Sequence, residues 1–527
     1  MEKVTRKLPL SIQDFEDLRN KDFLYVDKTS YVKRLATYGK QYFLGRPRRF
    51  GKSLFISTLK AYFLGKKHLF DGLYIGEIEK EWIEYPVFHL DFVGEQYTSE
   101  YYFNAKLDAI LRVFESQWGK DEADTTFPAR FSGLIRRAYE KTGKQVVVLV
   151  DEYDKPLLES MHNKDLHEIV ISTLKSFYGV LKSMDICLRF VFITGITKFS
   201  KVSIFSDLNH LTDISLSDEY AGICGLTETE LKDNFQPELK ALAKNLDISE
   251  ENAFAQLKKN YDGYHFSRRS DHIYNPYSVL NTFYSNYFEY YWFETGTPTF
   301  LVQMIRSFRL DPRKFSTNDV AVPIDFLSDY RVNGTDPVPV LYQSGYLTIK
   351  RFDSKYNSYF LGYPNEEVRY GFMKNMLGVY SPADVQIMNS FFAGDFVRKL
   401  EVGDIESFMS MVKSFYKSIQ YDAIDNEKKD EKYYQLIFYL LFTLMGQFTQ
   451  IEVKDANGRA DAVVKTADSI FVFEFKMDNK ATAEDALNQI DTKEYLIPYT
   501  TDGRKLFKIG AEFSVEKRGL TRWVINN

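Results

Sequence analysis

The sequence predicts an α/β protein in three parts: a parallel sheet flanked by helices, a mostly helical middle region, and a mixed α/β domain at the C-terminal end. Strand-like and helix-like stretches alternate over residues 1–215, which is typical of a parallel sheet. Residues 216–410 are mostly helical in pattern, although strand signals at 346–352 and 359–361 indicate a small mixed subdomain. Residues 411–527 return to a mixed pattern. A chain of 527 residues is long enough for three domains with these bounds.

The composition is that of a globular protein, with 44% hydrophobic and 27% charged residues. The net charge of −5 provides no overall attraction to nucleic acid. Two cysteines exclude a disulfide scaffold and a Cys-rich zinc site. The N-terminus lacks the apolar segment of a signal peptide, and the longest apolar run, residues 433–445, is too short to span a bilayer. We expect a cytoplasmic protein with no membrane partner.

Four apolar segments of the first domain are strand candidates. The third contains VVVLV, which is apolar on both faces, as expected of a central strand covered by helices. The candidates are Gln41–Leu44, Pro86–Phe92, Gln145–Val150 and Arg189–Thr194. The first is followed by a helical pattern over Ser53–Leu64, for which Gly65 provides the C-cap.

The segment YFLGRPRRFGKSLFISTLK runs from a strand through a loop into a helix that opens at Gly51. Backbone N–H groups and the helix dipole at such a point favour an anion. In a Walker A loop, Lys52 would reach the β- and γ-phosphates, and the Ser53 hydroxyl would coordinate Mg²⁺. The pattern therefore predicts an ATP site.

The loop before this helix is basic, because Arg48 and Arg49 stand close to Lys52. A local basic loop suits a phosphate better than a whole duplex, so we expect both arginines in the nucleotide site. The position of the usual first glycine is held by Arg46. By spacing alone, a basic turn that merely caps a helix is the alternative interpretation.

Acidic residues follow the third strand, in the sequence VVVLVDEYDKP. Asp151 is placed to hold Mg²⁺, and Glu152 to orient the attacking water as a general base. Thr194 ends the next strand, where its hydroxyl could sense the γ-phosphate, or merely cap the strand. The two motifs, about 100 residues apart in an alternating α/β pattern, together favour nucleotide binding.

Five segments together resemble the AAA-ATPase-like family of bacterial proteins, which carry a PD-(D/E)XK nuclease domain at the C-terminus. These segments are LPLSIQDFEDLRNKDFLYVDKTSYVKRL, YFLGRPRRFGKSLFISTLKAYF, VDEYDKP, NYDGYHF and YNPYSVLNTF. The family's own glycine loop is similar to RPRRFGKS, so the arginine at position 46 agrees with the resemblance. The resemblance implies an ATP-binding domain in which Lys52, Ser53, Asp151 and Glu152 have the roles given above.

The last domain has the pattern helix, three strands, helix, two strands. We expect helices over 433–445 and 482–495, and strands over 449–454, 460–465, 470–476, 505–513 and 521–525.

The segment GRADAVVKTADSIFVFEFKMD places Asp461 at the start of one strand and Glu474 and Lys476 at the end of the next. Alternation puts Glu474 and Lys476 on one face, and hairpin pairing brings Asp461 beside Glu474. Two neighbouring carboxylates need a cation or a proton between them, and hard oxygen ligands select Mg²⁺ or Mn²⁺. Lys476 would orient the attacking water and help to deprotonate it. This is the PD-(D/E)XK signature, and an ordinary surface hairpin is the alternative.

Three further residues fit this prediction. Glu431, just before the 433–445 helix, could add a third acidic metal ligand. Gln489 and Tyr495, on the helix after the hairpin, resemble the Gln…Tyr element of RecB-like nucleases, so that Gln489 joins the catalytic set.

The leading hypothesis is an ATP-regulated, metal-dependent nuclease that acts on nucleic acid, with DNA favoured over RNA. The alternative is a nucleotide-switched nucleic-acid-binding or scaffold protein with an inactive nuclease fold, and the absence of an obvious basic track in residues 411–527 supports it. Helicase activity is disfavoured because no further helicase-type motif occurs. The sequence is compatible with an oligomer.

Overall fold

The computed structural model describes residues 6–161, 163–198, 204, 210–269, 271–294, 308, 311–316, 318–328, 336–381, 394–419, 431–446, 450–452 and 460–526. The chain divides into two compact units. The N-terminal unit comprises residues 1–308 and 314–369, and the C-terminal unit comprises 309–313 and 370–527. The domain boundaries at 215 and 410 remain predictions.

A five-stranded parallel sheet forms the centre of the N-terminal unit, which confirms the predicted fold class. Its strand order is β2-β3-β4-β1-β5. The strands are β1 (Gln41–Gly45), β2 (Val87–Asp91), β3 (Val146–Asp151), β4 (Leu188–Gly195) and β5 (Thr212–Asp213). Every residue of β3 is buried, as its uninterrupted apolar run predicts. Because β4 lies between β1 and β3, the carboxyl ends of these three strands meet at one edge of the sheet.

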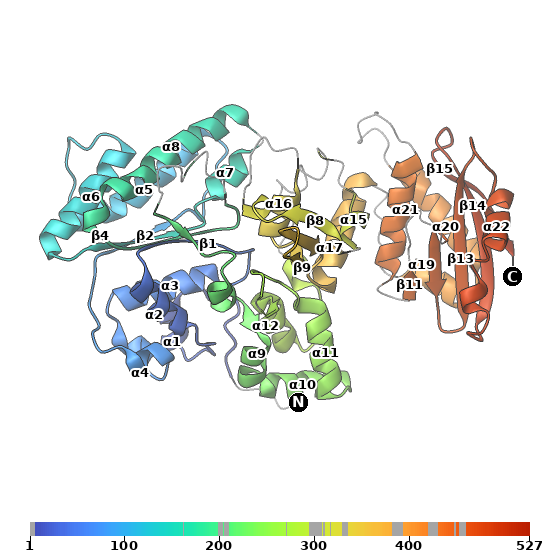
Figure 1. Cartoon of the computed structure of the whole chain (residues 1–527), viewed down its shortest axis with the longest axis horizontal. Coiled ribbons are helices and arrows are strands. Elements are labelled where there is room, and N and C mark those ends of the chain that lie inside the picture. The colour runs from blue at the N-terminus through green and yellow to red at the C-terminus, as the bar shows by residue number, and fades with distance from the viewer. Residues whose placement is uncertain are drawn as a thin grey trace. The chain divides into compact units, whose positions relative to one another are not determined.

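Helices cover both faces of this sheet (Figure 1). On one side lie α1 (Phe15–Asn20), α2 (Thr29–Tyr38), α3 (Lys52–Phe63) and α4 (Tyr74–Ile78). On the other side lie α5 (Glu100–Trp118), α6 (Phe127–Thr142), α7 (Lys155–Ser160) and α8 (Lys164–Ser183). Local sequence sets several of the helix ends. The side chain of Thr126 accepts the N–H of Ala129 at the start of α6, and that of Asn163 accepts the N–H of Leu166 at the start of α8.

The rest of the N-terminal unit is mostly helical with a small mixed part, as predicted. Four helices share one apolar cluster. They are α9 (Glu228–Asn234), α10 (Gln236–Leu246), α11 (Glu250–Tyr261) and α12 (Pro276–Ser285). Further elements include the pair β6 (Leu226–Thr227) and β7 (Ile273–Tyr274) and the short helices α13 (Tyr291–Glu294), α15 (Arg313–Ser316) and α16 (Val338–Gln343). An antiparallel sheet consists of β8 (Val320–Pro323), β10 (Ser358–Gly362) and β9 (Thr348–Asp353).

The C-terminal unit is built on a second five-stranded sheet, of order β11-β12-β13-β14-β15. Only the β13 and β14 pair is parallel. The strands are β11 (Gln450–Glu452), β12 (Ala462–Lys465), β13 (Ser469–Met477), β14 (Lys505–Ser514) and β15 (Gly519–Asn526). The helices are α17 (Glu366–Tyr380), which spans the division between the units, then α19 (Asp395–Glu401), α20 (Ile405–Ser418), α21 (Glu431–Met445) and α22 (Ala483–Thr492).

Alternation along β13 separates an aromatic face from a polar one. Phe473 and Phe475 face α21, where their ring centroids lie 5.1 Å from Phe442 and 4.0 Å from Phe438, respectively. Helix α22 covers the opposite face (Figure 1). Glu474, between the two phenylalanines, and Lys476, after them, therefore point toward α22.

A glycine sets the distance between α22 and the sheet. Gly510 on β14 pairs with Glu474 on β13. A Cβ atom at position 510 would lie 2.1 Å from the carbonyl oxygen of Ala483, in the first turn of α22. Any larger residue would push α22 away, so the glycine permits the close packing that positions the side chains of this helix.

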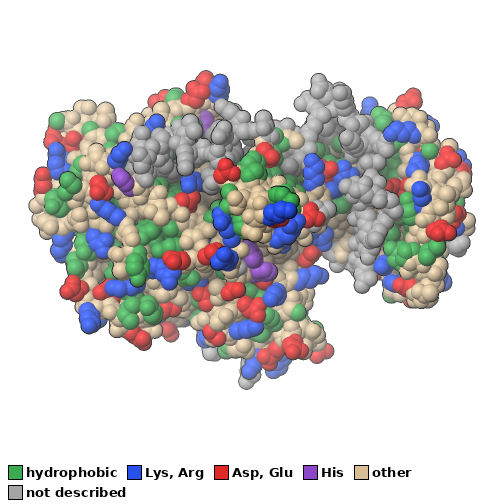
Figure 2. All heavy atoms as spheres, viewed as in Figure 1, with side chains coloured by type: hydrophobic (Ala, Val, Ile, Leu, Met, Phe, Trp, Pro, Cys, Tyr) green, Lys and Arg blue, Asp and Glu red, His purple; other side chains and the backbone are tan. Residues whose placement is uncertain are grey.

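No helix among the described residues is long and apolar enough to cross a membrane. On the face drawn in Figure 2, Lys and Arg side chains are interspersed with Asp and Glu. This agrees with the modest net charge of −5.

Candidate nucleotide and nuclease sites

The predicted phosphate loop connects β1 to α3. Gly51 is the N-cap of α3 and has a φ of +93°, a left-handed conformation that glycine adopts without strain. Lys52, the first residue of α3, is buried, and its Nζ donates to the carbonyl oxygens of Arg46 at 2.9 Å and Pro47 at 3.0 Å. The next residue, Ser53, is half-buried. The lysine ammonium thus lies against the loop that precedes α3, whose N-terminus also favours the negative charge of phosphate oxygens.

Arg46, at the position of the usual glycine, is a structural anchor. It is 1% exposed, and its guanidinium donates to the carbonyl oxygens of Gly45, Ser215 and Tyr220 at 2.8, 2.8 and 3.0 Å. The guanidinium carbon also lies 4.2 Å from the ring centroid of Phe266. Burial lowers the pKa of Arg46. Arg46 therefore joins the loop to distant segments of the unit, and its side chain points away from solvent.

The two other loop arginines are exposed. Arg49 has a φ of +66°, which is strained for a residue with a Cβ, and its guanidinium carbon lies 4.6 Å from the ring centroid of Tyr277 on α12. The carbonyl of Arg48 accepts the indole N–H of Trp292 at 3.3 Å. Two aromatic residues of the middle region, Tyr277 and Trp292, thus contact the loop. The assignment of Arg48 and Arg49 to phosphate binding remains a prediction.

The predicted acidic pair lies at the carboxyl end of β3. Asp151 is buried, and its Oδ1 accepts the hydroxyl of Thr194 at 2.7 Å and the N–H of Glu152 at 3.1 Å. Thr194, on the neighbouring strand β4, pairs in register with Leu44 of β1. It therefore lies between the phosphate-loop strand and the acidic strand. Glu152 has a φ of +48°, and such strain in a non-glycine residue is common at functional sites.

Asp154 is a buried acidic residue that the sequence analysis did not single out. Its Oδ2 accepts three hydrogen bonds, from the N–H groups of Ile196 and Thr197 and from the Thr197 hydroxyl, at 3.0, 2.6 and 2.7 Å. Burial raises the pKa of Asp154 to about 6, against the opposing effect of the Thr197 hydrogen bonds. The DEYD spacing is the signal that could have drawn attention to it. Asp154 fixes the chain that follows β4.

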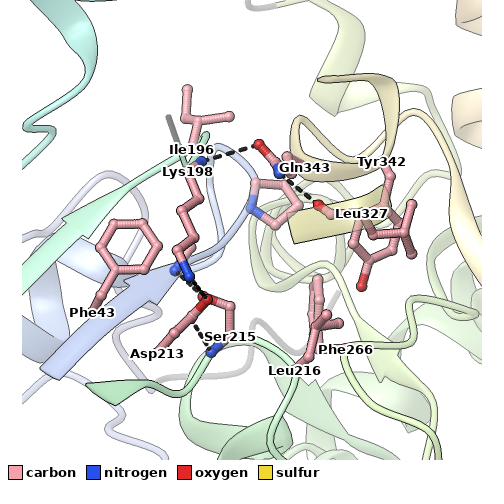
Figure 3. A pocket seen from close by; sticks show the side chains of 12 residues that line it. Phe43, Ile196, Lys198, Asp213, Ser215, Leu216, Phe266, Leu327, Tyr342 and Gln343 are labelled. Atoms are coloured by element: carbon pink, nitrogen blue, oxygen red, sulfur yellow. Dashed lines mark hydrogen bonds and ion pairs between the residues drawn. The ribbon is translucent and has the colours of Figure 1, made fainter. Parts of the chain in front are cut away.

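A small pocket of about 40 Å³ lies at the carboxyl ends of β1 and β5 (Figure 3). Lys198 Nζ donates to Asp213 Oδ2 at 2.6 Å, and the two side chains point toward one another across the pocket. The amide of Gln343 on α16 accepts the N–H of Lys198 at 3.0 Å and donates to the carbonyl of Leu327 at 2.7 Å. We call this the Lys198 pocket. Its polar groups are engaged with one another.

The nuclease-type residues lie where β12 and β13 pair. Ala462 pairs with Phe473, so the preceding residue, Asp461, lies beside Glu474, as hairpin alternation predicts. Asp461 Oδ2 accepts the backbone N–H of Phe475 at 2.8 Å, which holds the carboxylate against the end of β13.

Glu474, Lys476 and Gln489 form a closed set of hydrogen bonds. Lys476 Nζ lies 3.1 Å from Glu474 Oε1 and 2.6 Å from Gln489 Oε1. Gln489 Nε2 donates to Glu474 Oε1 at 2.5 Å, and the Tyr495 hydroxyl lies 3.4 Å from the same nitrogen. Strand β13 supplies the first two residues and α22 the third. The structure thus brings together residues that are separated by up to 15 positions in the chain.

The second oxygen of Glu474 is buried and has no hydrogen-bond partner among the described residues. Burial, followed by the repulsion of Asp461, raises the pKa of Glu474 to about 7. A buried carboxylate oxygen without a partner is costly unless it meets a proton or a cation. Asp461 and Glu474 therefore fit a divalent cation held by hard oxygen ligands.

The predicted third acidic ligand, Glu431, is the first residue of α21, and its side chain lies outside the described part of the structure. Within the described residues, no group of three or more His, Cys, Asp or Glu side chains is arranged to hold a metal ion. The role of Glu431 remains a prediction.

The fold and these two clusters define the class of protein: a P-loop ATPase-type domain joined to a nuclease-type α/β domain. Residues 9–205 match the AAA-ATPase-like family, described as Predicted AAA-ATPase, and residues 429–523 match the PD-(D/E)XK nuclease superfamily. The chain is 34% identical over 530 residues to "Uncharacterized protein in vnfD 5'region" of Azotobacter chroococcum mcd 1, with 99% of each chain covered. The chain belongs to the AAA-ATPase-like family and carries a PD-(D/E)XK nuclease superfamily domain at its C-terminal end.

Proposed function

We propose that this protein is a nucleotide-regulated, metal-dependent nuclease that cleaves phosphodiester bonds, with DNA as its substrate. The observation that carries the proposal is the buried Glu474 oxygen, which has no hydrogen-bond partner in the described part of the chain, beside Asp461 and the ion pair of Lys476 with Glu474. A surface hairpin would leave its carboxylates in water. The carboxylate of Glu474 is instead buried, which is unfavourable for its charged form and is typical of functional sites.

In the C-terminal unit, Asp461 and Glu474 are the proposed cation ligands. A bound Mg²⁺ or Mn²⁺ ion would supply stabilisation of negative charge on the scissile phosphate. Lys476 would orient the attacking water and favour its deprotonation, because its ammonium is fixed by Glu474 and Gln489. Gln489 in turn would keep both side chains in place when substrate enters.

In the N-terminal unit, Lys52 is the proposed ligand of the β- and γ-phosphates of ATP. Ser53 and Asp151 would hold the Mg²⁺ of the bound nucleotide, and Glu152 would orient the attacking water as a general base. Thr194 would report the state of the phosphates, because its hydroxyl bonds directly to the Asp151 carboxylate. The contact of the Arg49 guanidinium with the Tyr277 ring would transmit a conformational change of the loop to the middle region.

Plasmid cleavage by the purified chain tests this proposal. We expect strand cleavage with Mg²⁺ or Mn²⁺, a loss of about 100-fold or more in the Glu474→Gln and Lys476→Met variants, and wild-type activity in Lys480→Met. Lys480 is a matched control, because it is an exposed lysine just beyond the same strand. Lys52→Ala should abolish nucleotide binding and any effect of ATP on cleavage.

Binding of DNA without metal, combined with the absence of cleavage under all conditions, would instead support the scaffold function. The interspersed charges in Figure 2 are compatible with that second candidate, because they form no continuous basic track on the face drawn. Cleavage of a matching RNA at a higher rate than DNA would correct the substrate and leave the nuclease assignment intact.

A further inference from the structure

Helix α17 (Glu366–Tyr380) begins in the N-terminal unit and ends in the C-terminal unit. Its second residue, Glu367, is completely buried. The carboxylate of Glu367 accepts the hydroxyl of Ser278 at 2.8 Å and the backbone N–H of Trp292 at 2.8 Å. A buried carboxylate is costly unless hydrogen bonds replace its lost water, so these contacts fix the start of α17.

Both of these hydrogen-bond donors are joined to the phosphate loop. The indole Nε1–H of Trp292 donates to the carbonyl of Arg48 at 3.3 Å. Tyr277, the residue before Ser278 on α12, lies beside Arg49, with 4.6 Å between its ring centroid and the guanidinium carbon. A displacement of the loop can therefore reach the buried carboxylate by two routes, one through α12 and one through α13.

Two of the sequence segments that carry the family resemblance meet at this point. The segment YNPYSVLNTF supplies Tyr277 and Ser278. The segment NYDGYHF supplies Asp262, whose carbonyl accepts the side-chain amide of Asn365 at 2.8 Å. Asn365 directly precedes α17, and its side-chain oxygen accepts the N–H of Val368 in the first turn at 3.0 Å. The two segments thus join the phosphate loop to the start of α17.

The other end of α17 is attached to the helix that packs on the nuclease strand. The hydroxyl of Tyr433, on α21, donates to the carbonyl of Tyr380, the last residue of α17, at 2.8 Å. On the same helix α21, the ring centroid of Phe438 lies 4.0 Å from that of Phe475 on β13. The backbone N–H of Phe475 in turn donates to the carboxylate of Asp461 at 2.8 Å. A continuous series of contacts therefore leads from the end of α17 to a proposed cation ligand.

We propose that α17 and α21 transmit the state of the phosphate loop to the nuclease site, with Glu367 as the positioning residue on which the loop contacts converge. This inference rests on the proposed function and names how its nuclease site is regulated. An α-helix is stiff because each turn is hydrogen-bonded to the next, so a shift of the first turn of α17 also moves its last turn. Nucleotide binding at the loop thereby changes the position of Asp461, and with it the binding of the cation.

The ratio of the plasmid cleavage rate with ATP to the rate without ATP measures this transmission in the full chain. We expect the wild-type ratio to differ from one by about fivefold or more. Trp292→Phe combined with Ser278→Ala interrupts both routes from the loop to Glu367, and Tyr433→Phe detaches α17 from α21. In the double variant and in Tyr433→Phe, the ratio should lie within about twofold of one. The rate without ATP and the affinity for ATP should stay within about threefold of the wild-type values.

Two matched substitutions delete the same chemical groups where they make no hydrogen bond. Trp118→Phe removes a buried indole N–H, and Tyr274→Phe removes a buried tyrosine hydroxyl. Neither group has a hydrogen-bond partner in the part of the chain that the structure describes. Both controls should therefore keep the wild-type ratio.

Hydrogen exchange of the backbone amides supplies a second measurement that needs no cleavage. In the wild type, ATP should change the exchange rates of amides in both α17 and α21. In the double variant, neither helix should respond to ATP. In Tyr433→Phe, α17 should still respond and α21 should not, because the series of contacts is interrupted between the two helices.

A wild type that binds ATP but has a cleavage ratio of one would overturn the proposal. A wild-type ratio in both the double variant and Tyr433→Phe, or exchange in α17 that does not respond to bound ATP, would also overturn it. Failure of the proposed function has a different signature. If the chain cleaves nothing under any metal condition, the nuclease function is wrong, whereas an ATP response of α17 and α21 that follows the expected order still supports the transmission.

Discussion

Replacement of Glu474 by Gln removes an ionisable group whose surroundings are well defined. Burial and the neighbouring Asp461 raise the pKa of Glu474 from 4.5 to about 7. At about 1.4 kcal/mol for each pKa unit, this rise corresponds to about 3 kcal/mol. Because the folded-state pKa is raised, folding favours the protonated form. The stabilisation is complete below the unfolded pKa of 4.5 and is lost as the pH rises through 7.

The assay is urea unfolding between pH 4.5 and pH 8 in buffer that contains a chelator. Relative to Glu474→Gln, the wild type should lose about 3 kcal/mol of unfolding free energy across this range. Mg²⁺ at pH 8 should restore stability to the wild type and not to the variant, since a bound cation favours the carboxylate. The control is Glu401→Gln, which alters an exposed carboxylate at the end of α19 and should keep the wild-type profile.

Parallel pH profiles of the wild type and Glu474→Gln would refute the inference that Glu474 ionises in a desolvated position. Equal stabilisation of both proteins by Mg²⁺ would refute its role as a cation ligand. The two results are independent, because the first measures the ionisation of Glu474 and the second measures cation binding.

Three further substitutions test other contacts by urea unfolding. Gly510→Ala places a methyl group against the Ala483 carbonyl and should cost about 1–3 kcal/mol, whereas Gly378→Ala in α17, with open space around it, should be neutral or stabilising. Asp154→Asn turns one acceptor of the buried hydrogen bonds into a donor and should cost about 1–3 kcal/mol. Arg46→Ala leaves three carbonyl groups without their guanidinium donor and should cost about 3 kcal/mol or more.

Each of these substitutions has a contrary result. A wild-type stability for Gly510→Ala would mean that α22 is not held at the distance the glycine allows. Unchanged stability in Asp154→Asn would remove the role of this residue in fixing the chain after β4. If Arg46→Ala unfolds like the wild type, its three hydrogen bonds to carbonyl groups do not anchor the loop.

Much of the fold follows from local patterns. The predicted strands at Gln41–Leu44 and Gln145–Val150 correspond to β1 (Gln41–Gly45) and β3 (Val146–Asp151), because apolar runs bounded by turn residues report strands directly. The predicted strand at 470–476 likewise corresponds to β13. The neighbourhood of Asp461 and Glu474 was also predictable, since a hairpin with a period of two leaves little choice of register.

Other features required contacts that no local pattern encodes. The anchoring of Arg46 depends on the carbonyl of Ser215, 169 positions away, and on that of Tyr220. The requirement for glycine at position 510 arises only because α22 packs against the sheet at that point. The cavity of about 100 Å³ that Gly51 helps to line is walled by segments that precede and follow the phosphate loop in the sequence.

The sequence by itself determined the succession of strands and helices along the chain, the phosphate-loop and acidic motifs, and the family of the protein. These features depend on spacing and periodicity along the chain. Tertiary structure alone decided the raised pKa of Glu474, the burial of Arg46 and the cavity of about 100 Å³ that Gly51 helps to line. The reason is physical: desolvation, close packing and enclosed volume depend on which distant atoms exclude water from a given point. The sequence gives the chemical type of each side chain, but not the burial and neighbouring charges that shift its pKa.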